Sequence, residues 1–438
     1  MPHSRTESDT NKHTKAIIIV PGIMSSSVYA GSTFTVGSFT VSKGMRVWAP
    51  ARNRVFSAGK KVISLSCGKD GSPLYDVVTM PPVVNDKESE RSYGCLDMFK
   101  KLYGYLFDAF SSEYDIVLYE YDWRKSQFDV ACELDAFIDS SGYSGVVFIA
   151  HSMGGNITSY YLSLGKAQRK KVIKHISIGT PYLGCEKLVY SFDTGDAVDN
   201  YPNIGRFVIP FDLASILDNE IRAVVPNFSS AYDLVPLNYH FLPFLNIKIP
   251  WETRIIDTHT DTVDILSLHL KNWNGALYKK AVSNQERLFR HGKHVTKFVD
   301  SYYIVGDDVN TPETMQISLN AKMLKYRKLL AGKTKEGDGM VTLHSALIGN
   351  TVTKNVMFKY NMKGVSKADH VSLVDGSDDC KTFDFIRDVI RGVDVFGLRK
   401  NDFFERYSGF KMRHGFADIA QSVLDEVRAN RSGKTKRS

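Results

Sequence analysis

The sequence contains few cysteines, and their spacing argues against two kinds of covalent or metal stabilisation. There are five, an odd number, and none belongs to a C-x-x-C pair. They are Cys67, Cys95, Cys132, Cys185 and Cys380. A disulfide framework or a zinc site would require paired or clustered cysteines. The pattern therefore predicts neither of them.

Long apolar runs are also absent. Residues 1–15 are polar and lack the apolar centre of a signal peptide. No later segment approaches the roughly 18 apolar residues that a membrane span needs. We therefore expect a cytoplasmic protein, although a secreted chain whose leader has been removed would look the same.

Basic residues are too dispersed to indicate nucleic-acid binding. The formal net charge is +8 over 438 residues, and lysine and arginine gather in only two places, 166–174 and 428–437. A nucleic-acid-binding surface needs a denser stripe on a recognisable fold, so we expect no such partner. Peripheral contact with an anionic membrane through the basic tail and the cap is one expectation, and ordinary solvated charge is the alternative.

The chain does contain buried strands that alternate with amphipathic helices. The β-branched run Ala16–Val20 ends at Pro21-Gly22, which is typical of a strand buried on both faces. Similar runs occur at 116–119, 146–150, 176–178, 302–305 and 356–358. Apolar residues at helical spacing lie between them, as in 96–110. The pattern predicts an α/β fold with a mostly parallel central sheet and helices on both faces.

An aromatic, proline-bearing stretch interrupts this alternation after Thr180-Pro181. An insertion of that length between core strands predicts a cap. Its residues Phe241, Leu242, Phe244, Leu245 and Trp251 suit an apolar acyl chain or the core of the cap itself. We expect a flexible N-terminus (1–14), a core (15–185 and 300–428) with lid loops at about 25–77, a cap (186–299) and a basic tail (429–438).

Ser152 is the candidate nucleophile. It follows the apolar run V-F-I-A at 147–150 and opens the stretch S-M-G-G. A strand that turns sharply into a helix exposes such a serine, and the neighbours two positions away must be small. Ala150 and Gly154 meet this requirement. The alternative is a serine that only caps a helix.

The base should be a histidine that follows the acid in the chain, as in α/β-hydrolases. His344, His370 and His414 are the candidates. His370 follows a polar stretch after the last core strand, whereas His344 is only six residues beyond Asp338 and His414 lies in the C-terminal tail. We predict His370; the alternative is a surface-loop histidine.

Two segments could supply the acid that orients this base. Asp338 lies between two glycines in E-G-D-G-M-V, while Asp308 directly follows the strand at 302–305. The first pattern favours a tight turn that aims a short carboxylate, although a D-G pair is also an ordinary turn. On the residues alone we favour Asp338 and keep Asp308 open. The oxyanion hole should use the backbone N–H groups of Met153 and Ile23.

Short blocks in a fixed order make the chain resemble the lecithin:cholesterol acyltransferase-like branch of the α/β-hydrolases, which includes lysosomal phospholipase A2. The blocks are I-I-V-P-G-I-M-S-S-S (18–27), V-W-A-P (47–50), Y-D-W-R (121–124), I-A-H-S-M-G-G (149–155), I-G-T-P-Y-L-G (178–184), Y-D-L-V-P (232–236), G-D-G-M-V-T-L (337–343) and A-D-H (368–370). The resemblance implies Asp338 as the acid and an oxyanion donor after Pro21-Gly22. It also implies an acyl-chain tunnel beneath lid and cap.

The chain departs from this family in two respects. Ser25 and Ser26 stand where relatives often have glycine followed by serine or asparagine. Secreted members close the lid loop with a disulfide, for which Cys67 and Cys95 are the candidate pair. We interpret Tyr121–Arg124 as scaffold beneath the site.

Together these patterns predict a serine hydrolase of carboxylic esters, with a lipid or another ester as substrate. Ser152, His370 and Asp338 would form the triad, without metal or organic cofactor. Lipase, phospholipase, acyltransferase and small-ester or thioester hydrolase share this chemistry, because the cap sets specificity. A non-catalytic membrane- or partner-binding protein on the same scaffold is the alternative from another class.

Overall fold

The structure is a computed structural model. It describes residues 13–49, 55–89, 92–194, 219–236, 245–249, 252–256, 270, 272–319, 326–360, 368–377, 381–398, 402, 406–407 and 410–412.

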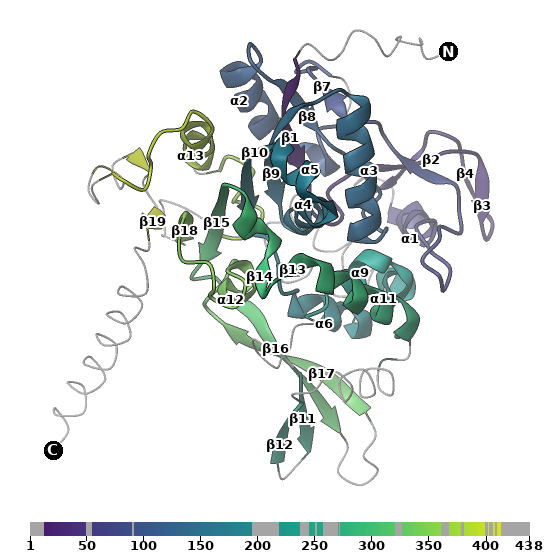
Figure 1. Ribbon diagram of the computed structural model, residues 1–438. Helices are drawn as coiled ribbons and strands as arrows, with labels where there is room; N and C mark the ends of the chain where they lie inside the picture. Colours follow the sequence, from purple (N-terminus) through teal and green to yellow (C-terminus); the bar gives the residue numbers. More distant parts are fainter. Residues whose placement is uncertain are drawn as a thin grey trace, which may run out of the picture.

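A central eight-stranded sheet organises the fold (Figure 1). Its strand order is β19-β18-β15-β10-β9-β1-β8-β7. The strands are β1 (Lys15–Val20), β7 (Val83–Val84), β8 (Asp115–Leu118), β9 (Gly145–His151), β10 (Val172–Ile178), β15 (Ser301–Asp307), β18 (Val356–Tyr360) and β19 (Phe410–Met412). The six inner strands pair in parallel and only the two edge strands are antiparallel. The predicted mostly parallel sheet is therefore confirmed.

Helices cover both faces of this sheet, because successive strand residues point to opposite sides. Helices α3 (Gln127–Ser140) and α4 (Met153–Leu164) pack in one apolar cluster with Ile18 and Phe148. Helices α2 (Lys100–Phe110) and α13 (Lys381–Ile390) pack in a second cluster, with Ile17 and Ile149. The central strands β1, β8 and β9 thus bury both of their faces, which explains their continuous apolar sequences.

The segment expected to form lid loops is more regular than the sequence indicated. It contains a three-stranded sheet and a hairpin: β2 (Val28–Ala30), β5 (Arg46–Trp48) and β6 (Val77–Thr79), then β3 (Phe34–Val36) and β4 (Phe39–Val41). It also contains helix α1 (Val55–Ile63). Each of these strands has only three residues, so its alternation is too short to be recognised in the sequence.

The cap-side elements combine two separate stretches of chain. One supplies α6 (Glu186–Thr194), η3 (Val225–Asn227), α9 (Ser229–Asp233), β11 (Leu245–Ile249), β12 (Glu252–Ile256) and α11 (Gly275–Gln285). The other supplies the hairpin β16 (Thr311–Leu319) and β17 (Tyr326–Thr334), which joins β11 and β12 in a four-stranded sheet. This sheet projects away from the central sheet, below α6 in the view of Figure 1.

Shorter elements complete the fold. They are η2 (Cys95–Asp97), α5 (Lys166–Lys171), η4 (Glu286–Leu288), β13 (Phe289–Arg290), β14 (Lys293–His294), η5 (Val295–Phe298) and α12 (Leu343–Ala346). Among the residues that the structure describes, no helix is long and apolar enough to cross a membrane. His414 and the predicted basic tail lie outside the described residues.

A buried carboxyl group between α9 and α3 predicts a pH-dependent stability. An oxygen of Asp233 accepts the backbone N–H of Gln127 at 2.7 Å, and burial raises the pKa of Asp233 to about 7. The folded chain thus holds this proton to a higher pH than the unfolded chain, whose aspartates titrate near about 4. The stabilising contribution of the protonated Asp233 is complete below about pH 4. It is lost as the pH rises through about 7, the pKa in the folded chain.

We therefore expect Asp233→Asn, which keeps an acceptor for Gln127, to lose less thermal stability than the wild type between pH 5 and pH 8. Thermal unfolding across this range measures the difference. Asp139→Asn is the matched control, because Asp139 is exposed on α3, the helix of Gln127, and pairs with Lys171 at the surface. An Asp233→Asn profile parallel to that of the wild type would contradict the prediction.

Candidate active site

Ser152 occupies a strained turn between β9 and α4. Its backbone has φ 55° and ψ −128°, a conformation that residues with a side chain seldom adopt. The strand ends at His151 and the helix begins at Met153, so the serine lies at the tip of the turn. This is the strained strand-to-helix geometry that the sequence pattern predicted for a nucleophile.

Two glycines permit the close packing around this turn. A Cβ on Gly154 would lie 2.1 Å from the carbonyl oxygen of Val20, at the end of β1. A Cβ on Gly22 would lie 2.7 Å from the Cβ of Ser152. The loop that follows β1 therefore presses directly against the serine, and any larger residue at either position would displace it.

Asp338 and His370 form a buried hydrogen-bonded pair. The Nδ1 of His370 lies 2.7 Å from Oδ2 of Asp338. The other carboxylate oxygen accepts the backbone N–H groups of Met340 and Val341 at 2.9 and 2.8 Å. Because a carboxylate can only accept, the hydrogen of the shared contact lies on Nδ1 of His370. This leaves Nε2 as the basic nitrogen, the arrangement that a general base requires.

The tertiary structure separates the two candidate acids. The hairpin β16–β17 leaves the end of β15 and returns to it, so that Asp338 pairs with Val309 in a parallel bridge. Gly306, near the end of β15, faces this carboxylate: a Cβ there would lie 2.7 Å from the Cβ of Asp338. Asp308 instead is exposed and forms a surface ion pair with Lys335 at 3.4 Å. The hairpin β16–β17 therefore returns the chain to the end of β15, and this return places Asp338 next to His370.

Gly179 brings the serine side and the acid–base side together. The backbone N–H of Ser152 donates to the carbonyl of Ile178 at 2.8 Å. The next residue, Gly179, has φ +57°, and a Cβ on it would lie 3.0 Å from Oδ2 of Asp338 and 3.1 Å from Nδ1 of His370. The alternative base His344 lies on α12. All three predicted residues thus lie at the carboxyl ends of neighbouring parallel strands, where α/β folds place their sites.

The loop 21–27, which would supply one oxyanion donor, is held by hydrogen bonds from several elements. The Tyr121 hydroxyl donates to the Pro21 carbonyl at 2.5 Å, and the Trp123 indole N–H donates to the Ser26 carbonyl at 3.2 Å. The Trp48 indole N–H donates to the Met24 carbonyl at 2.7 Å. The blocks V-W-A-P and Y-D-W-R therefore act in part as scaffold for this loop.

Ile23 and Met153, the two predicted oxyanion donors, both lie near Ser152. Ile23 follows Gly22, which packs on the serine. Met153 is the first residue of α4, and the first N–H groups of a helix have no acceptor within it. They also lie at the positive end of the helix dipole. Both backbone donors are therefore near the nucleophile, and their role as an oxyanion hole remains a prediction.

The cysteines of the lid region do not form the disulfide that the resemblance suggested. Cys67 and Cys95 are both free and buried. Burial raises the pKa of the Cys67 thiol to about 11 and that of Cys95 to about 12, so both stay protonated near neutral pH. The backbone N–H of Cys95 instead holds the loop after β1, because it donates to the carbonyl of Ser25 at 2.5 Å.

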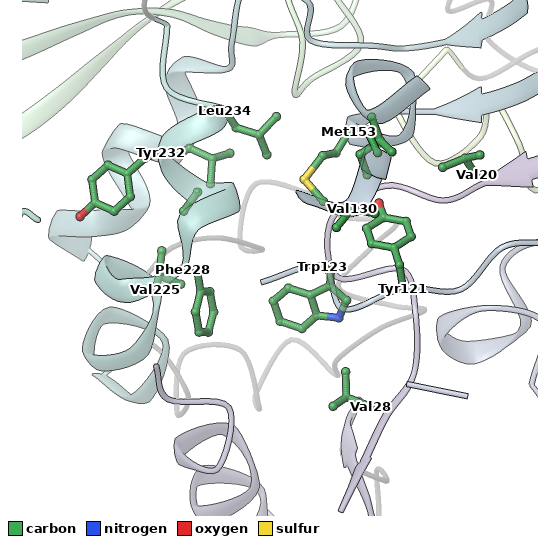
Figure 2. Close-up of a cluster of buried hydrophobic side chains, with 14 of the residues drawn as sticks. Val20, Val28, Tyr121, Trp123, Val130, Met153, Val225, Phe228, Tyr232 and Leu234 are labelled. Atoms are coloured by element: carbon green, nitrogen blue, oxygen red, sulfur yellow. The ribbon is translucent and has the colours of Figure 1, made fainter. Parts of the chain in front are cut away.

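An apolar pocket opens beside the candidate oxyanion loop. Its cavity volume is only about 30 Å³, and it is lined by Ile23, Met24, Trp48, Val62, Leu65, Trp123, Leu188, Ser191, Ile221, Val224, Val225, Phe228 and Ala231. Ser191 is its one polar side chain, and its hydroxyl already donates to the Lys187 carbonyl at 3.0 Å. The rings of Trp123 and Phe228 pack edge to face, with their centroids 5.6 Å apart (Figure 2). The pocket wall thus offers no unsatisfied polar group from a side chain.

Sequence reasoning did not identify the residues of this pocket. They come from the lid region, α6 and the cap, and only their contact in space makes them a lining. The aromatic cap residues at 241–244 and Trp251 lie outside the described residues, as do the side-chain surroundings of Leu245. Among described residues, no group of three His, Cys, Asp or Glu side chains could hold a metal ion.

Comparison with known proteins supports the same fold and family branch. Residues 99–216 match the family model of lecithin:cholesterol acyltransferase, a segment that includes Ser152 but neither Asp338 nor His370. This match confirms the resemblance that the sequence blocks indicated. No curated protein matches the chain.

Solved structures are similar to the chain over most of its length. A structure of the Tle4–Tli4 complex aligns with 12% identity and a TM-score of 0.53, covering 87% of this chain and 99% of that chain. The mature lipase BlEst2 of Bacillus licheniformis aligns with 12% identity and a TM-score of 0.33, covering 88% of this chain and 96% of that chain. At this identity, the first of these similarities supports the α/β-hydrolase fold and nothing finer.

Proposed function

We propose that this protein is a serine hydrolase or acyltransferase that acts on carboxylic esters of lipids through Ser152, His370 and Asp338. The observation that carries the proposal is the Asp338–His370 pair, whose Oδ2 and Nδ1 atoms are 2.7 Å apart. The pair lies at the carboxyl ends of the sheet strands, as does Ser152 in its strained strand-to-helix turn. The family match, which covers this serine, supports an ester hydrolase or acyltransferase. Such a constellation is the recurring machinery of acyl transfer.

In the proposed reaction, His370 Nε2 removes the proton of the Ser152 hydroxyl as its oxygen attacks the ester carbonyl. The carbonyl oxygen becomes an oxyanion that the N–H groups of Ile23 and Met153 receive. The protonated His370, oriented by Asp338, then gives its proton to the departing alcohol. Water or a second alcohol attacks the resulting acyl-serine in the same way, releasing the acid or a new ester.

The pocket supports an apolar acyl chain as the substrate group. Its lining is apolar, and Ile23 belongs to both the pocket and the proposed oxyanion hole. The cavity of about 30 Å³ is too small for an acyl chain, so the lining would have to move apart to admit one, and its carbonyl would then lie close to Ser152. Burial of methylene groups would stabilise the complex by about 0.8 kcal/mol each, which favours long chains over short ones.

Two alternatives make different predictions for substrate range. A small-ester or thioester hydrolase would use the same triad but leave the pocket unfilled. A non-catalytic binding protein would have no reason to keep the serine, acid and histidine together. Membrane contact through the cap and the basic tail stays a further proposal, because most of the cap's predicted contact residues and the tail lie outside the described residues.

The first test is hydrolysis of p-nitrophenyl esters from acetate to palmitate, with phospholipid vesicles as a parallel substrate. We expect kcat/KM to rise with chain length until the pocket is filled. Activity confined to the shortest esters would favour the small-ester enzyme. Absence of hydrolysis on every ester and on vesicles would contradict the proposal.

A larger side chain in the pocket should shorten the preferred acyl chain. Ala231, on α9, is fully buried in the pocket wall. We expect Ala231→Phe to lower kcat/KM for palmitate at least about 10-fold relative to acetate, because the loss of a few buried methylenes reaches this size. Acetate hydrolysis in the same variant is the internal control. Val62→Phe, on α1, tests the lid-region part of the lining, and an unchanged chain-length profile in both variants would exclude this pocket as the acyl site.

A further inference from the structure

His151 has no role in the mechanism described so far, yet it lies buried beside the proposed base. It is the last residue of β9 and only 3% exposed. Its ring packs edge to face on Phe99, with the centroids 6.0 Å apart. The His370 ring lies closer, 4.8 Å between centroids. A polar ring enclosed in this way needs a partner or costs stability.

The contact of His151 with His370 has a defined direction. Its Nε2 lies 3.0 Å from the backbone carbonyl oxygen of His370. A carbonyl can only accept, so the hydrogen lies on Nε2 of His151, which donates. Burial and the nearby His370 lower the pKa of His151 to about 3. The ring is therefore neutral at pH 7 and adds no charge beside the base.

The other ring nitrogen of His151 argues against a purely structural explanation. Its Nδ1 is buried and has no hydrogen-bond partner among the residues the structure describes. An apolar side chain at this place would avoid that cost. Retaining the histidine therefore suggests that the bond from Nε2 serves the site.

The backbone of His370 is held from two sides. Its N–H donates to the Asp338 carbonyl at 2.9 Å, and its carbonyl accepts from His151. Asp338 also fixes the tautomer and rotation of the ring through Nδ1. What remains to be set is the distance between His370 and Ser152. His151 and Ser152 are consecutive residues, so a donor on His151 ties the base to the strand that carries the nucleophile.

We propose that His151 is a positioning residue that holds the His370 backbone at a fixed distance from Ser152. This inference rests on the proposed function, because it concerns the geometry of proton transfer between these two side chains. Removal of the bond would leave the backbone of His370 itself with its bond to Asp338 alone, while Lys359 still holds the loop through the Ser372 carbonyl at 2.8 Å. A displacement of about 1 Å between reacting groups can lower a rate about 100-fold.

The test compares two side chains of nearly equal length that differ in the donor. Glutamine can donate an N–H from the position of the histidine Nε2, and methionine cannot. We expect His151→Met to lower kcat about 10- to 100-fold with KM changed less than about 2-fold, because binding is intact and only the chemical step is impaired. His151→Gln should recover most of the lost kcat. The rate of Ser152 labelling by a fluorophosphonate should follow the same order.

His175 provides the matched control. It is a buried histidine on the neighbouring strand β10, hydrogen-bonded to Thr158 Oγ1 at 2.9 Å, and burial lowers its pKa to about 4. We expect His175→Met to disturb packing to a similar degree but to leave kcat within about 3-fold of the wild type, since no bond to His370 is lost. Thermal unfolding of every variant shows whether each is folded. If His151→Met does not fold, His151→Phe is the second donor-free variant.

The outcomes separate this inference from the proposed function. A wild-type protein that neither cleaves esters nor reacts with the fluorophosphonate would remove both. An active wild type together with a fully active His151→Met would overturn only the positioning role. The same holds if His151→Gln is as slow as the donor-free variants, or if His175→Met loses as much activity as His151→Met.

Discussion

Replacing Ser152 with alanine should abolish ester hydrolysis while the fold is retained. The hydroxyl is the proposed nucleophile, and without it no acyl-enzyme can form. We expect kcat on p-nitrophenyl esters to fall by about 10⁴-fold or more, the range found when serine hydrolases lose a triad member. Alanine keeps the Cβ that packs against Gly22, so the thermal unfolding temperature should change little.

Covalent labelling makes this test independent of the choice of substrate. The wild type should gain the mass of one fluorophosphonate adduct, and Ser152→Ala should gain none, because only an activated serine reacts. Ser159→Ala is a suitable control, since Ser159 is a buried serine on the same helix whose hydroxyl donates to the Gly155 carbonyl at 2.7 Å. Labelling of Ser152→Ala at the wild-type rate would refute the assignment. An unlabelled, inactive wild type would favour the non-catalytic alternative.

Replacing Asp338 with asparagine should have the next largest effect. The carboxylate accepts from Nδ1 of His370 at 2.7 Å and so keeps Nε2 free to act as the base. An amide in its place can present an N–H to the ring and favour the opposite tautomer. We expect kcat at neutral pH to fall about 10⁴-fold, the loss that follows when a triad histidine is held in the wrong tautomer. Ester hydrolysis at saturating substrate measures this directly.

Asp308→Asn is the matched control for the acid. Asp308 is the other acid that the sequence allowed, and its exposed ion pair with Lys335 is of a kind that contributes little energy in water. We expect its activity to stay within about 2-fold of the wild type. A large loss in Asp308→Asn with a fully active Asp338→Asn would reverse the assignment. Thermal unfolding of both variants separates lost chemistry from lost structure.

The candidate site illustrates why some residues can be predicted and others cannot. Ser152 is recognisable because its requirements are local: an apolar strand before it, small residues two positions away and a helix after it. The choice between Asp338 and Asp308 is not local, since both stand in polar turns near the same strand. The resemblance favoured Asp338, and the returning hairpin β16–β17 supplies the physical reason.

The lid region shows the opposite case, in which local patterns misled the prediction. Its strands span only three residues each, and neighbouring strands stabilise them more than their own sequence does. The apolar pocket likewise has no signature in the chain, because its lining extends from Ile23 to Ala231. The interpretation of Y-D-W-R as scaffold agrees with the bonds from Tyr121 and Trp123 to the loop after β1.

By itself, the sequence determined the alternation of strands and helices, the strained serine turn and the short set of candidate bases and acids. These depend on side-chain periodicity and on steric limits within a few residues. Only the tertiary structure decided which aspartate meets His370, that Cys67 and Cys95 stay apart as free thiols, and that His151 donates to the backbone of His370. Such contacts join residues that are tens to hundreds of positions apart, and their distances follow from how the whole sheet and its insertions pack.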